Sequence, residues 1–169
     1  MGGWGGKIKL LDLHDSAHSV LTEVGEYGNH ILSITPLTAT TVLVGGYGGI
    51  IKLLDLRDPA HPILTEVGEY GDRIWSITSL TATTALVGGE GGKIKLLDLR
   101  DPAHPVFTEV GEHGDTIYSI TPLTATMFLV GGDGGKAQLW QIPEDALRRY
   151  HEAKIRPPEI PPMPETSNV

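Results

Sequence analysis

The residues that could do chemistry in this chain recur in fixed patterns. Asp58-Pro-Ala-His61 and Asp101-Pro-Ala-His104 each place a carboxylate three residues before an imidazole. One Asp and one His are too few ligands to hold a metal without help from elsewhere in the chain. Proline fixes φ and Asp bonds its own backbone in tight turns, so both patterns favour a turn. We therefore predict no metal site.

Two other candidates for catalysis are also repeated. Glu66 with Glu69, and Glu109 with Glu112, resemble the carboxylate pairs of glycoside hydrolases. An active site is normally unique, whereas this pair stands at equivalent places in the chain, which favours solvated charges at strand ends. Ser76 has no His and Asp partners at a spacing that would activate it. The sequence predicts that the protein is not an enzyme.

The glycine-rich stretch 88–93 reads Gly-Gly-Glu-Gly-Gly-Lys and could be taken for a phosphate cradle. A P-loop needs Gly-Lys-Ser/Thr at the start of a helix. Here the lysine opens a run with strand character, and glycines that permit positive φ in a hairpin explain the pattern better. No cofactor is predicted.

Composition narrows the function classes further. The chain has 169 residues, 40% of them hydrophobic, which fits about one globular domain. Its formal net charge of −8 disfavours nucleic acid as a partner, because phosphate binding needs clustered Lys and Arg. No apolar run approaches ~18 residues, so no membrane-spanning helix is expected. There is no cysteine, which excludes disulfides and thiolate metal sites. Because the chain also has no apolar signal-peptide core, we expect a cytoplasmic protein, without excluding the nucleus.

The elements that would position these residues form an internal repeat of 43 residues, as the spacing of Asp12, Asp55 and Asp98 shows. Units run over about 3–45, 46–88 and 89–131, with a partial copy at 132–142. The second and third units share 33 of their 43 residues. We take 1–142 as one region of repeats.

Each unit contains four short apolar or β-branched runs separated by turn signals. Four successive runs of this kind, which span parts of the second and third units, are 74–78, 85–89, 94–99 and 106–110. Each has the usual length of a strand. A unit of this length with four strands is typical of a β-propeller blade. The sequence therefore predicts an all-β fold made of about three four-stranded blades.

The stretch 87–100 resembles the hairpin and third strand of WD40 repeats. Leu97 stands where that family has the Trp of its Trp-Asp pair, Asp98 keeps the Asp, and only the last copy has a tryptophan, Trp140. The family's Gly-His pair is replaced by Gly111-Glu112. The resemblance covers 1–142 and implies degenerate WD40-like blades, in which the family's His-Asp-Ser-Trp hydrogen-bond network cannot form in its usual version.

Blade strands are labelled a to d from the centre outward, and the chain then reads c d, a b c d, a b c d, a b c. Three blades do not close a ring, since propellers have about four to eight. Two alternatives remain. Two copies could form a ring of six blades, with 20–24 completing the last blade and the extra c strand displaced. The chain could instead be a truncated fragment of a longer array with no independent function.

The C-terminal region has a different composition. In 143–156 a proline and two acids precede several bases, which predicts a short helix. Residues 157–169 are rich in proline, and we expect a disordered tail of polyproline II character. Pro158 and Pro161 could form a PxxP ligand, although a plain tail explains them as well.

The b–c turns and the d–a loops of neighbouring blades are expected to share one rim, and that rim is rich in residue types found at interfaces. We predict that it binds a protein or peptide partner. Variation on exposed loops is the simpler alternative, and a lectin-like oligomer that binds glycans or small ligands at repeated sites is another. The candidate rim residues are Trp4, Tyr27, His30, Tyr47, Tyr70, Arg73, Glu90, His113 and Asp133.

Overall fold

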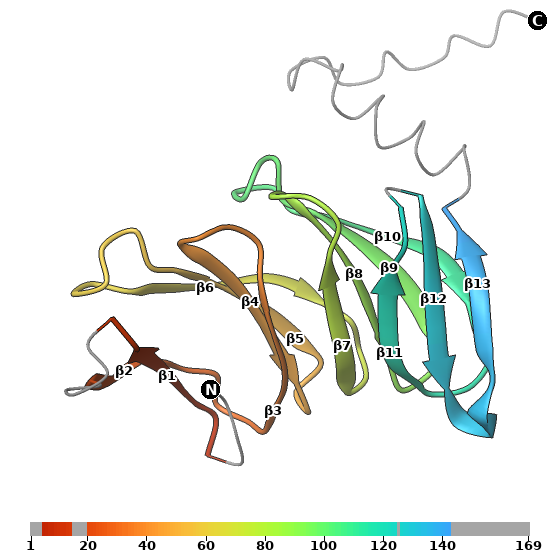
Figure 1. The fold of residues 1–169 in the computed structure, drawn as a ribbon, viewed down its shortest axis with the longest axis horizontal. Helices are drawn as coiled ribbons and strands as arrows, with labels where there is room; N and C mark the ends of the chain where they lie inside the picture. Colours follow the sequence, from red (N-terminus) through yellow and green to blue (C-terminus); the bar gives the residue numbers. More distant parts are fainter. Residues whose placement is uncertain (1–4, 15–19, 125, 143–169) are drawn as a thin grey trace, which may run out of the picture.

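Thirteen short β-strands make up the regular structure of the described residues, which are 5–14, 20–124 and 126–142 of a computed structural model (Figure 1). One short 3-10 turn, Asp133–Gly135, is the only helical element there. The strands are β1 Lys7–Asp12, β2 Val20–Glu26, β3 Ile31–Pro36, β4 Thr41–Gly46, β5 Ile50–Asp55, β6 Ile63–Glu69, β7 Ile74–Ser79, β8 Thr84–Gly89, β9 Lys93–Asp98, β10 Val106–Glu112, β11 Ile117–Pro122, β12 Met127–Gly132 and β13 Ala137–Gln141.

The strands form four antiparallel sheets in chain order, with the pairings β1-β2, β3-β4-β5-β6, β7-β8-β9-β10 and β11-β12-β13. Neighbours in each sheet are neighbours in the sequence, so every connection within a sheet is a hairpin. The sequence of two, four, four and three strands predicted from the repeat is confirmed, and so is the all-β class. No sheet closes on itself. The predicted helix 143–156 and tail 157–169 lie outside the described residues.

The outer hairpins of three of the four sheets have the same irregularity. A β-bulge interrupts the register at Ile8/Lys9, at Ile51/Lys52 and at Glu109/Gly111. The bulge lets the outer strand bend and continue, which is why β10 reaches Glu112 rather than ending at residue 110 as predicted. The strand therefore includes a glycine that the sequence pattern had assigned to a turn.

Apolar side chains fill the spaces between successive sheets. Leu96 and Leu97 are consecutive in β9 and point to opposite faces, yet only 5% and 0% of their surfaces are exposed. One cluster joins the second and third sheets and another joins the third to the fourth. Sheets with two buried faces need such double apolar runs, and this explains why the inner strands lack the usual alternation of apolar and polar residues.

Hydrogen bonds also link the innermost strands of successive sheets, β3 to β7 and β7 to β11, which lie side by side in Figure 1. The Ser33 hydroxyl accepts from the Ile77 N–H at 3.1 Å, and the Thr35 hydroxyl donates to the Ile77 carbonyl at 2.5 Å. The same two contacts recur one repeat later, from Ser76 and Thr78 to Ile120. We call this pair of contacts the Ser/Thr clamp. It fixes the stagger between neighbouring sheets.

Within the part of the chain that the structure describes, no helix is long and apolar enough to cross a membrane.

Candidate partner-binding site

Main-chain hydrogen bonds bring the loop before each sheet against the turn that follows its second strand. The Tyr47 N–H donates to the His30 carbonyl at 3.0 Å, and the Glu90 N–H donates to the Arg73 carbonyl at 2.9 Å. A third contact of this kind joins Asp133 to Thr116. The d–a loops and b–c turns of the predicted rim therefore do lie together, at one end of the stacked sheets.

Glycine makes this close approach possible. A Cβ atom on Gly46 would lie 1.9 Å from the His30 carbonyl oxygen, and one on Gly89 would lie 1.9 Å from the Arg73 carbonyl oxygen. No side chain fits there without moving the loop. The glycines that end β4 and β8 thus place the residues of the rim.

Four aromatic rings form a continuous row across three sheets. His30 and Tyr47 are 4.9 Å apart between ring centroids, Tyr47 and Trp75 are 6.4 Å apart, and Trp75 and Tyr118 are 5.3 Å apart. All three contacts are edge-to-face, the geometry that aromatic quadrupoles favour. We call these four residues the aromatic row. Each side chain comes from a different loop or strand, so the row depends on how the sheets stack.

Arg73 extends the row sideways. Its guanidinium lies 4.5 Å from the centre of the Tyr47 ring, and its Nη1 lies 2.9 Å from Oε1 of Glu90. Both ends of the ion pair are well exposed, so the pair stabilises the fold little. The cation–π contact shows instead that a positive charge is accommodated over the row.

Two carboxylates, those of Asp133 and Glu90, lie near Tyr118 at the other end of the row. Hydrogen bonding to Asp133 raises the pKa of the Tyr118 hydroxyl, and the nearby negative charge of Glu90 adds to this shift. A carboxylate oxygen of Asp72 lies 2.9 Å from where a Cβ of Gly91 would stand, which places it beside the turn of Glu90. The surroundings of the aromatic row are therefore more acidic than basic.

Two of the predicted rim residues are buried supports. Tyr27 and Tyr70 are only 4% and 5% exposed, and their hydroxyls donate at 2.6 Å to the carbonyls of Ile50 and Lys93. Burial raises the pKa of Tyr70 to about 12 and also raises that of Tyr27. These tyrosines hold the loops in place, and their burial keeps their rings from direct contact with a partner.

The other predicted rim residues also differ in whether they lie at the aromatic row. His113, the counterpart of those tyrosines in the next repeat, is half-buried, and its Nδ1 lies 2.8 Å from Oε1 of Gln138. Trp4 lies outside the described residues. The structure brings together His30, Tyr47, Arg73, Glu90 and Asp133 near the row.

The rim residues predicted from the sequence do not include Trp75 and Tyr118, which the structure places in the aromatic row. Each is the second residue of an inner strand, β7 or β11, where Leu32 stands in β3. Tyr118 is 48% exposed, so it does not serve packing alone. The replacement of a leucine by aromatic residues in two of three copies was the signal that could have found them.

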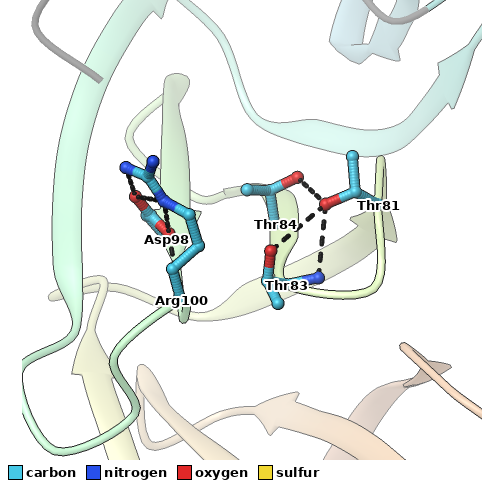
Figure 2. A network of polar contacts seen from close by, with 5 residues as sticks. All are labelled: Thr81, Thr83, Thr84, Asp98 and Arg100. Carbon is cyan, nitrogen blue, oxygen red and sulfur yellow. Dashed lines mark hydrogen bonds and ion pairs between the residues drawn. The ribbon is translucent and has the colours of Figure 1, made fainter. Parts of the chain in front are cut away.

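The opposite rim carries a polar network (Figure 2). The Thr81 and Thr84 hydroxyls are 2.7 Å apart, and the Thr83 N–H donates to the Thr81 hydroxyl at 3.2 Å. Beside them Asp98 accepts from Nε of Arg100 at 2.9 Å and from the Arg100 main chain at 3.0 Å. The network closes a turn and anchors the loop after β9, which is a structural role.

One cavity of about 540 Å³ lies at this rim, one repeat earlier. Thr41, Asp55, Arg57 and Thr65 line it on one sheet, and Pro102 borders it from the next sheet. The hydrogen bond from Arg57 lowers the pKa of Asp55, so the carboxylate stays ionised. Leu53, Ile63 and Val67 also line the cavity, so it combines an apolar wall with hydroxyls and one charge of each sign.

The Asp-Pro-Ala-His sequences form turns, as predicted. In the first of them Asp58 accepts from the Ala60 N–H at 3.1 Å, and its second oxygen lies 2.8 Å from Nδ1 of His61. The same contacts recur at Asp101, whose pKa is lowered chiefly by the hydrogen bond to His104. Each aspartate therefore caps its turn, and each histidine contacts the aspartate of its own turn.

No protein-family model matches this chain, and no curated protein matches it. Among solved structures it is similar to the computationally designed Ika4 protein, with a TM-score of 0.67 and 15% sequence identity. The match covers 84% of this chain and 83% of that chain. At this identity the likeness concerns the fold alone.

Proposed function

We propose that the chain is a non-catalytic protein-binding scaffold built of WD40-like β-propeller blades. The 43-residue repeat, the a-to-d strand order and the face-to-face stacking of the sheets support the blade architecture. The observation that carries the binding function is the aromatic row, which crosses three sheets on one rim.

The row has the properties of an interface hot spot. Tyr and Trp supply large, rigid contact areas, and Tyr, Trp and Arg dominate binding energies at protein interfaces. Tyr47 and Tyr118 are 39% and 48% exposed, so their rings are accessible while their edges are held by neighbouring rings. A surface that is both exposed and fixed loses little entropy when it binds.

The charges around the row favour a basic peptide. Glu90 and Asp133 lie near it, and Arg73 already places one guanidinium over a ring. An extended segment with Arg or Lys would repeat this cation–π contact at Trp75 or Tyr118 while its charge is met by the carboxylates. The net charge of −8 attracts such a ligand at longer range.

Selection from a phage-displayed library of random peptides tests this proposal. Peptides enriched on the wild-type chain should contain Arg or Lys and should bind Tyr47→Ala at least about tenfold more weakly, as expected for a hot-spot residue. Glu90→Gln should weaken them less and reduce their dependence on salt. Ile63→Ala, which changes an exposed apolar residue on the outer strand β6, should leave the affinity unchanged.

Two results would refute it. The first is a failure to enrich any peptide on the wild-type chain. The second is a set of enriched peptides that bind Tyr47→Ala and Ile63→Ala as tightly as the wild type.

The cavity at the opposite rim supports a second candidate, a lectin-like site. Threonine hydroxyls and the Asp55–Arg57 pair are groups that hydrogen-bond sugar hydroxyls. A glycan array would separate the two functions, because glycan binding should be lost in Arg57→Ala and kept in Tyr47→Ala. An array without binding would remove this candidate.

A further inference from the structure

The Ser/Thr clamp is half used at one end of the described molecule. Ser33 with Thr35, and Ser76 with Thr78, each hold an isoleucine of the next sheet. The third set, Ser119 and Thr121 on β11, is exposed and has no further sheet to hold among the described residues.

The main-chain groups that would receive such a clamp lie at the other end of the described molecule, on β3. Ile34 on β3 is the counterpart of Ile77 and Ile120, whose main chains receive the clamp. No described serine or threonine clamps the main chain of Ile34. One chain therefore presents two complementary halves of a contact that it forms twice inside itself, which is the condition for a head-to-tail interface between copies.

Among the described residues the outer edge of β13 lacks a covering strand, and β2 of a second copy could supply one. In the two complete sheets a strand of the pattern Thr-Glu-Val-Gly-Glu, β6 or β10, covers this edge of the third strand. No described strand covers β13. The strand β2 has the same pattern and directly precedes β3, so a copy that seats β3 on β11 brings β2 to the open edge.

A charge at this edge fits the same arrangement. Lys7 and Lys93 each form an ion pair at 3.2 Å with a glutamate of the covering strand, Glu23 and Glu109. Lys136 is the counterpart of these lysines just before β13. In the register of the other sheets, Glu23 of a second copy would meet it.

We propose that a second copy of this chain completes the C-terminal sheet: its β3 accepts the clamp of Ser119 and Thr121, and its β2 pairs with β13. The β1 strand of the second copy then separates from β2, and β13 of the first copy takes its place next to the β3–β6 sheet of the second copy. When both copies do this the dimer has six stacked sheets, within the range of about four to eight that closed propellers contain.

The exchange is favourable because it replaces one strand pairing by another and adds contacts. The pairing of β1 with β2 is lost and the pairing of β2 with β13 is gained. The added contacts are the two clamps and the burial of the end faces. Leu139, which is 59% exposed, lies on β13, one of the strands that would be covered.

A reversible lock on β2 tests the exchange. Leu10 and Thr22 are directly opposite in β1 and β2, so oxidised Leu10→Cys/Thr22→Cys holds the two strands together, at the spacing a disulfide needs. Leu53→Cys/Thr65→Cys is the matched control, since it joins the equivalent pair in β5 and β6 and leaves β2 free. The natural chain has no cysteine, so each variant has one possible disulfide within the chain.

Light scattering after size exclusion gives the readout. The wild type, the oxidised control and the reduced lock should have twice the chain mass of 18.1 kDa, whereas the oxidised lock should stay at 18.1 kDa. The proposal is wrong if the wild type is a monomer at all concentrations or forms more than two-copy assemblies. It is equally wrong if the oxidised lock dimerises as readily as the reduced one.

A second pair of variants tests the clamp without cysteines. Ser119→Ala/Thr121→Val should raise the dissociation constant of the dimer by about tenfold or more, because it removes two hydrogen bonds per interface. Ser76→Ala/Thr78→Val makes the same change inside the chain. It should lower the melting temperature and leave the dissociation constant unchanged. Equal effects of both variants on dimerisation would contradict the proposed contact.

Discussion

At the scale of single residues, the position of a tyrosine decides its role. Tyr47 and Tyr70 both lie in short connections on the same rim, yet the first is exposed in the aromatic row and the second is buried with its hydroxyl on a carbonyl. The local sequence around each tyrosine does not distinguish them, but the repeat does. An aromatic ring at the Tyr70 position in every copy, as Tyr27, Tyr70 and His113, indicates a supporting role common to all sheets.

Trp75 provides a test of how the row is held together. Its indole N–H is buried and makes no hydrogen bond to the described residues. Trp75→Phe removes that donor and keeps a ring, so its free energy of unfolding should stay within about 1 kcal/mol of the wild type. Trp75→Ala should lose about 3 kcal/mol through the cavity left between sheets. Chemical denaturation measures both, and equal losses would mean that the indole N–H has a partner.

The buried tyrosine predicts an alkaline limit to stability. The folded-state pKa of Tyr70 is raised to about 12, above the value of about 10 for an unfolded chain. The stabilisation is therefore complete below about pH 10 and is lost as the pH rises toward 12, because only the unfolded chain releases the proton there. Denaturation at increasing pH should show this fall, and Tyr70→Phe should flatten it. An unchanged slope in the variant would contradict the assignment.

At the scale of strands and turns, the local pattern was sufficient for most of the fold. Repeated apolar runs and glycine turns predicted the strands and their grouping, with errors of one or two residues at the ends. The end of β10 was missed because a bulge is a property of two paired strands, and the run 106–110 alone does not show its partner.

The close approach of turn and loop predicts a sharp contrast between two glycines. Gly89→Ala would place its Cβ 1.9 Å from the Arg73 carbonyl oxygen, so it should destabilise the chain by about 2 kcal/mol or more. A Cβ on Gly48, in the turn between β4 and β5, would meet no atom closer than 3.8 Å, and Gly48→Ala should change stability by about 0.5 kcal/mol or less. The melting temperatures of the two variants are compared with that of the wild type. Similar shifts would show that the loop at Arg73 moves at little cost in free energy.

At the scale of the whole molecule, the candidate site exists only because sheets stack. The row joins side chains from β7, β11 and two connections that are far apart in the sequence, and the clamp between inner strands sets their spacing. The sequence predicted that the two kinds of connection share one rim, because they alternate in the repeat, and main-chain hydrogen bonds do join them. It did not identify Trp75 or Tyr118, because their outward direction depends on the stagger of neighbouring sheets.

The central claim is that the aromatic row binds a basic peptide, and chemical-shift mapping tests it most directly. Titration of the isotope-labelled chain with a selected Arg- or Lys-containing peptide should move the amide signals of Tyr47, Arg73, Trp75 and Tyr118 together, with one saturation curve. Signals at the opposite rim, such as those of Thr41 and Asp55, should stay in place. Shifts confined to that opposite rim, with the row unaffected, would contradict the account.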